Sequence, residues 1–220
     1  MSLVELIAGA DERGLAASGL GCLDRCVPLL GGDDEVLRPL WASLGEGGDA
    51  VEWGDRLERA RAVLVPEPGP GEAAPAADEA AALALRMLAA APADLPDKLQ
   101  GGGPPDARLR EWADLCSLSA LRVHRLLDPA GGRGLLDPAG GRGKGAGDGA
   151  DPADDRLTAS RAGAADGLSP LAAAELRRQI VILELLAGRG AAGLRQVHGA
   201  TTEGRRILRA VVSRRARGRN

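Results

Sequence analysis

The apolar residues of this chain are almost all aliphatic, and this feature most constrains its fold. Hydrophobic residues make up 45% of the 220 positions, yet Trp41, Trp53 and Trp112 are the only aromatic residues. Strands favour β-branched and aromatic side chains, whereas alanine and leucine, which are abundant here, lose little side-chain entropy in a helix. The composition therefore predicts an all-α protein: an irregular helical bundle of about seven to eight helices with long flexible linkers.

Residues 1–65 are predicted to form an N-terminal helical unit. It opens with Ser2 and Glu5 in capping-box spacing, in which each side chain satisfies a backbone amide at the other residue. The last of its four predicted helices carries an apolar stripe made of Trp53, Leu57, Ala60 and Leu64. Three- and four-residue steps place side chains on one helix face, so this face is predicted to be buried.

The second and third predicted helices of the N-terminal unit each contain a proline. The stretch from Leu15 to Leu30 has an apolar stripe, and Pro28 is expected to end or kink this helix early. The following helix is expected to be capped by Asp33 or Asp34 and to bend at Pro39, which removes one backbone donor.

The middle of the chain alternates linkers with helix. Residues 66–77 are rich in proline and are predicted to be a linker, and residues 78–127 a helical segment. The best-patterned helix of this segment carries a stripe of Leu109, Trp112, Cys116, Ala120, Val123 and Leu127. Residues 128–167 are rich in glycine and aspartate, and with the duplicated LLDPAGGRG at 126–134 and 135–143 they are predicted to be a disordered linker.

Residues 168–220 are predicted to form C-terminal helices and a basic tail that pack with residues 78–127, so that the whole chain can form one domain. Ser169 as a cap and Pro170 in the first turn mark a helix start. Its predicted stripe is Leu171, Leu176, Ile180, Leu183 and Ala187. Heptad spacing continues over 194–211, which predicts either one long helix or two abutting ones, since two internal glycines weaken a single helix by about 1 kcal/mol each.

Cysteine and histidine are the residues examined first for chemistry. Cys22 and Cys26 share a helix face, but zinc sites usually have close ligand pairs at both ends, and only one pair exists here. Cys116 lies within an apolar stripe, where burial would raise its pKa and blunt its reactivity. His124 and His198 are interpreted as structural residues. We therefore predict no catalytic, cofactor or metal site.

Phosphate-binding loops and carboxylate pairs were also sought. Gly143 and Lys144 resemble the end of a P-loop, but Gly145 replaces the required serine or threonine. The carboxylates are numerous, and none falls in a setting apolar enough to shift its pKa. The sequence thus nominates no acid/base pair.

Charge is distributed unevenly along the chain. The last 17 residues carry seven arginines and no acid: Arg205, Arg206, Arg209, Arg214, Arg215, Arg217 and Arg219. Because the whole chain has a net charge of −3, the preceding part is strongly acidic. These arginines are the candidate anion-binding residues, although docking of the tail onto the acidic body of the protein needs fewer assumptions.

The source and compartment can also be inferred from composition. Of the 28 basic residues only Lys98 and Lys144 are lysines, and alanine, glycine and proline abound, which suggests a GC-rich, actinobacterium-like bacterial genome. Three cysteines, an N-terminus without a basic leader and the lack of a long apolar run favour a cytoplasmic protein without membrane contact.

Three hypotheses about function follow. The first is a non-enzymatic helical module that binds or scaffolds another protein or self-associates, because apolar helix faces are wide and no catalytic constellation is visible. The second is nucleic-acid or anionic-surface binding through the C-terminal arginines, which predicts a strong salt dependence. The third is an enzyme whose site is assembled only in the folded state.

Overall fold

A computed structural model describes residues 1–45, 52–65, 79–95, 99, 106–128, 152–164 and 167–217. The described residues form helices joined by turns and contain no strand, which confirms the all-α prediction. The α-helices are α1 (Leu3–Gly9), α2 (Glu12–Cys26), α3 (Arg38–Ser43), α4 (Trp53–Leu64), α5 (Glu79–Ala89), α6 (Ala107–Leu127), α7 (Pro152–Arg161), α8 (Pro170–Arg189) and α9 (Leu194–Arg217). Two 3₁₀ helices adjoin them, η1 (Val27–Leu30) and η3 (Gly190–Gly193).

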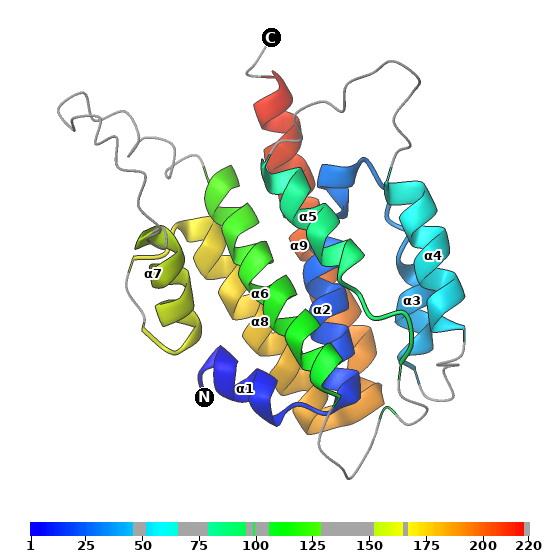
Figure 1. Ribbon diagram of the computed structural model, residues 1–220. Coiled ribbons are helices and arrows are strands. Elements are labelled where there is room, and N and C mark those ends of the chain that lie inside the picture. The colour runs from blue at the N-terminus through cyan, green and yellow to red at the C-terminus, as the bar shows by residue number, and fades with distance from the viewer. Residues whose placement is uncertain are drawn as a thin grey trace, which may run out of the picture.

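Helix α2 lies at the centre of the molecule and is surrounded by α6, α8 and α9, while α7 and the α3–α4 pair lie at opposite edges (Figure 1). All fifteen residues of α2 are buried, including Asp24 and Arg25. A helix with one apolar stripe normally leaves its polar face in water. Because α2 has neighbours on all sides, its charged residues must find partners inside the protein.

Both prolines of the N-terminal unit lie in the first turn of a short helix. The chain changes from α2 to the 3₁₀ helix η1 just before Pro28, and η1 ends at Gly31 with a φ of 72°. This confirms that Pro28 ends the helix early. The bend expected at Pro39 is wrong, because α3 begins only at Arg38 and the missing amide of Pro39 falls where no helical partner is needed.

The capping box of Ser2 and Glu5, the cap at Ser169 and the stripes of two helices are confirmed. The cap expected from Asp33 or Asp34 is wrong, because Leu37 precedes α3 and makes no side-chain cap hydrogen bond. The backbone amide of Ser2 donates to Glu5 Oε2 at 2.7 Å, and the amide of Glu5 donates to Ser2 Oγ at 3.3 Å. Asp106 caps α6 and Ser169 caps α8. The predicted stripes of α4 and α6 are buried throughout.

The structure contradicts the prediction for one segment and settles an open alternative for another. Within residues 128–167, predicted as a disordered linker, the structure contains α7. This helix contacts α6, is joined to it by an ion pair between Arg122 and Asp154, and has Leu157 buried. That part of the prediction is wrong, because the partners of these residues lie in α6. The heptad pattern over 194–211 belongs to one continuous helix, α9.

The linker predicted at 66–77 and the repeated LLDPAGGRG beyond residue 128 lie outside the described residues. Within the described part of the chain, no helix is long and apolar enough to cross a membrane.

Candidate functional site

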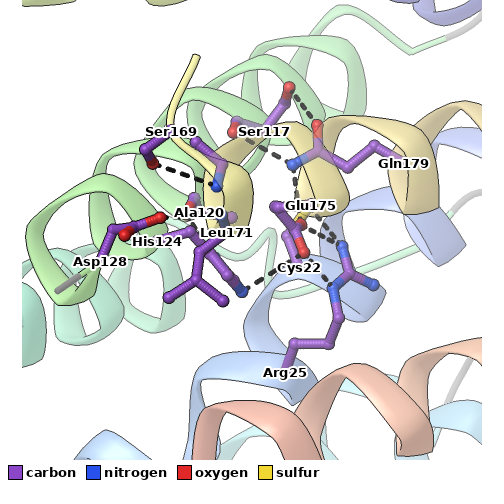
Figure 2. Close-up of polar contacts among 11 residues, drawn as sticks. Cys22, Arg25, Ser117, Ala120, His124, Asp128, Ser169, Leu171, Glu175 and Gln179 are labelled. Atoms are coloured by element: carbon purple, nitrogen blue, oxygen red, sulfur yellow. Dashed lines mark hydrogen bonds and ion pairs between the residues drawn. The ribbon is translucent and has the colours of Figure 1, made fainter. Parts of the chain in front are cut away.

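A charged pair lies in the core between α2 and α8 (Figure 2). Arg25 donates from Nε to Glu175 Oε2 at 2.8 Å and from Nη2 to Glu175 Oε1 at 2.5 Å, and neither side chain has any exposed surface. The same Nη2 also donates to Cys22 Sγ at 3.4 Å. Two parallel bonds between a guanidinium and a carboxylate are the geometry that such a pair prefers.

The pair continues into a network that reaches α6 (Figure 2). Gln179 donates to Glu175 Oε1 at 2.8 Å and accepts from Ser117 Oγ at 2.7 Å. His124 Nδ1 donates to the carbonyl of Ala120 at 2.8 Å, and its Nε2 lies 3.6 Å from Glu175 Oε2. Because a carbonyl can only accept, Nδ1 carries a proton and the second nitrogen faces the carboxylate.

Burial and pairing set the charge states of this network. Burial acts to raise the pKa of Glu175, but the charge of Arg25 and the hydrogen bonds from Arg25 and Gln179 outweigh it, so the pKa is lowered and the group is a carboxylate. Burial lowers the pKa of His124 despite the nearby Glu175, which favours the neutral ring. Burial also raises the pKa of Cys22 to about 12, so this sulfur is a thiol. The network therefore lacks a thiolate nucleophile at neutral pH.

The prediction that no carboxylate lies in an apolar setting is wrong for Glu175, which is fully buried. The predicted stripe of α8 is displaced from the face that is actually buried. That face consists of Ala172, Glu175, Gln179, Ile182, Leu183 and Leu186. Glu175 and Gln179 follow the apolar residues of this face at regular three- and four-residue steps. That spacing is the signal in the sequence that could have identified the buried face of α8.

The three cysteines are all free and fully buried. Cys116 lies near Cys22 and Cys26, and burial raises the pKa values of Cys116 and Cys26 well above the usual range. Within the described ranges, no group of three or more His, Cys, Asp or Glu side chains could hold a metal ion.

An open cleft of about 660 Å³ lies on the surface between α3 and α9. Glu35, Arg38 and Trp41 line the α3 side. The α9 side presents Arg195, His198, Thr202, Arg205 and Arg206, which recur at three- and four-residue steps and so share one helix face. The rings of Trp41 and His198 meet edge to face with centroids 5.9 Å apart. We call this the α3–α9 cleft.

Two residues that line the α3–α9 cleft, Trp41 and Arg205, are held by Asp24, a buried residue of α2. One carboxylate oxygen accepts from Trp41 Nε1 at 2.8 Å, and the other is hydrogen-bonded to Arg205 Nη1. Arg205 Nε also lies 3.2 Å from Asp34, which pairs with Arg209 at 2.7 Å. One buried carboxylate thus fixes the indole and the guanidinium that the two opposite helices contribute.

The seven C-terminal arginines do not act as one group. Arg205 and Arg209 pair with carboxylates of the protein, and Arg215 donates to the carbonyl of Leu126 at 2.5 Å. The exposed side chains of Arg206, Arg214 and Arg217 make no hydrogen bond or ion pair with another described residue, and Arg219 lies outside the described residues. Arg195, which is not part of the predicted basic tail, is also exposed and without such a partner.

Comparison of the chain with protein-family models, with curated protein sequences and with solved structures finds no match.

Proposed function

We propose that this chain is a non-enzymatic helical module that binds a segment of another protein in the α3–α9 cleft. The observation that carries the proposal is the composition of this cleft. Arg195 and Arg206 bring charges that no described residue neutralises, and the exposed edge of the largely buried Trp41, which Asp24 holds in place, lines the opposite wall. Arginine and aromatic side chains are the types that contribute most binding energy at protein interfaces.

The core network supports a structural role better than a catalytic one. Its carboxylate and amide are hydrogen-bonded within the protein, its imidazole donates to the carbonyl of Ala120, and their side chains are almost fully buried. Two further surface clefts, beside α4 and beside the start of α6, are lined by other residues. A catalytic acid or base must lie within reach of a substrate, and none of these clefts brings the network to a surface.

We further propose that the protein acts in the cytoplasm of a bacterium. The free, buried cysteines suit a reducing compartment, and the arginine-rich composition suits a GC-rich genome.

The test uses Thr202→Trp to fill the cleft. Thr202 lies on the cleft wall, and its hydroxyl donates to the carbonyl of His198 at 2.9 Å. Thr158 on α7 is a matched control, because its hydroxyl donates in the same way to Asp154 and it lies outside the cleft. Immobilised wild-type protein and both tryptophan variants are incubated with extract of the source cells, and bound proteins are quantified by mass spectrometry. We expect a partner that Thr158→Trp retains and Thr202→Trp loses, whereas equal recovery on all three proteins would refute the proposal.

A second candidate function is binding of nucleic acid along α9. The observation in its favour is that Arg195, Arg206 and Arg217 recur every eleven residues, which is close to three helical turns, so they lie on one side of the helix. Duplex DNA binding that falls steeply with salt, and that is lost in Arg206→Gln with Arg217→Gln, would favour this function.

A further inference from the structure

The two unpaired arginines of the α3–α9 cleft are held at a fixed separation. Arg195 and Arg206 both line the cleft and belong to the same continuous helix. Eleven residues of α-helix span roughly 16 Å along the axis. His198 and Thr202 lie between them on the same face, and the ring of Trp41 is packed against His198. The cleft therefore presents a cation, the half-buried ring of His198 beside the exposed edge of Trp41, and a second cation in a row.

We propose that the segment recognised here is an extended acidic peptide whose two carboxylates are four to six residues apart, with an apolar side chain between them that packs on His198 and the exposed edge of Trp41. This inference rests on the proposed function and specifies the chemistry of its partner. An extended chain advances about 3.3 Å per residue, so side chains four or six positions apart, which point to the same face of the chain, bracket the separation of the two arginines. A cleft of about 660 Å³ is also of the size that holds a short ligand rather than a whole helix.

The α3 side of the cleft argues against a continuous polyanion. Glu35 lies on this wall with its side chain 66% exposed, and it pairs with Arg38 at 2.7 Å. Asp34 lines the same side. A nucleic-acid strand carries a charge on every phosphate and would bring several of them against these two carboxylates. A peptide with two separated carboxylates can meet Arg195 and Arg206 and leave neutral backbone opposite Asp34 and Glu35.

The first experiment selects ligands without assuming a sequence. Random twelve-residue peptides displayed on phage are selected on three proteins: wild type, Arg195→Gln with Arg206→Gln, and a control with Arg177→Gln and Arg214→Gln. The control also removes two exposed arginines that pair with no described residue, but neither lines the cleft. We expect wild type and control to enrich peptides with two acidic residues four to six positions apart, and the cleft variant to lose this enrichment.

The second experiment measures affinity with one synthetic peptide from the selection, using titration calorimetry. Each partly exposed charge pair contributes a factor of up to about five in affinity, so losing both should weaken binding about tenfold. Replacement of both acidic residues of the peptide by glutamine should have the same effect on wild type, and no further effect on the cleft variant. A peptide with the two acids adjacent can form only one of the two charge pairs, so its affinity should lie between those of the selected peptide and the glutamine peptide.

Several outcomes would overturn the inference. These are a selected consensus without the acid spacing, no selected peptide at all, equal losses in the cleft and control variants, or tighter cleft-dependent binding of a DNA duplex than of the peptides. Capture by the Thr202→Trp and Thr158→Trp proteins separates the two proposals. A cleft-dependent partner with a neutral peptide consensus would leave the proposed function standing and remove only the acidic specificity.

Discussion

Arg25 and Glu175 are 150 residues apart in the chain, and they form a doubly hydrogen-bonded ion pair in the core with no exposed side-chain surface on either residue. The pair joins the central helix α2 to α8. Each charge offsets the cost of removing the other from water, and it can do so only while the two groups stay in contact. The two helices are therefore expected to pack in only one relative position.

Removal of one member of this pair should be costly. Glu175→Gln leaves the guanidinium of Arg25 buried without its counter-charge, so the free energy of unfolding should fall by about 3–5 kcal/mol. Urea denaturation followed by circular dichroism measures the change. Glu35→Gln is the matched control, because the Glu35–Arg38 pair is exposed to solvent and its loss should change the stability far less.

The double replacement Arg25→Met with Glu175→Leu should restore part of the stability that Glu175→Gln loses. It removes both charges together and fills the space with apolar groups, which cost nothing to desolvate. If the double variant is less stable than Glu175→Gln, the pair contributes more than the cost of burying its charges, contrary to this expectation.

Acid should destabilise the protein through His124. Burial holds the pKa of this ring below 6.5 in the folded protein, while in the unfolded chain it has its usual value. As the pH falls below about 6.5, the unfolded chain binds a proton that the folded protein rejects, so the free energy of unfolding decreases. His124→Asn keeps a donor toward the carbonyl of Ala120 and cannot titrate. Between about pH 7.5 and pH 5 its stability should fall less steeply than that of wild type, and parallel curves would contradict the assignment.

Two glycines of α9 should respond to alanine in opposite directions. A Cβ on Gly199 would meet nothing within 4 Å, so Gly199→Ala should stabilise the helix by about 1 kcal/mol. A Cβ on Gly204 would lie 2.4 Å from Cδ of Arg25, whose guanidinium is fixed by Glu175. Gly204→Ala should therefore destabilise the protein, by about 1–3 kcal/mol. Thermal melting of the two variants distinguishes the signs directly.

Trp112 should be one of the most sensitive positions of the core. Its indole is 2% exposed, donates to the carbonyl of Met87 at 2.9 Å and packs edge to face with Trp53. Trp112→Ala should reduce the free energy of unfolding by about 3–5 kcal/mol. A loss below about 1 kcal/mol in denaturant unfolding would show that this face of α6 is not the core.

Local patterns in the sequence were sufficient to predict the class of the fold and many helix ends. The capping box of Ser2 and Glu5, the cap at Ser169 and the stripe through Trp112 depend on residues three or four positions apart. Interactions over such short separations form wherever the helix forms, and they do not require a particular neighbour. These features could therefore be read before any tertiary structure was known.

Only the tertiary structure decided which polar residues are buried and where a ligand can bind. The periodicity of α8 predicted a stripe through Leu176, but the face with Glu175 is buried instead. This is possible because the opposite charge of Arg25 offsets the desolvation cost of burying Glu175. Asp24 likewise supports the α3–α9 cleft only because Trp41 and Arg205 converge on it from two other helices. The free energy of burying a charge depends on partners that are distant in sequence, so local patterns determined the helices and long-range pairing determined the site.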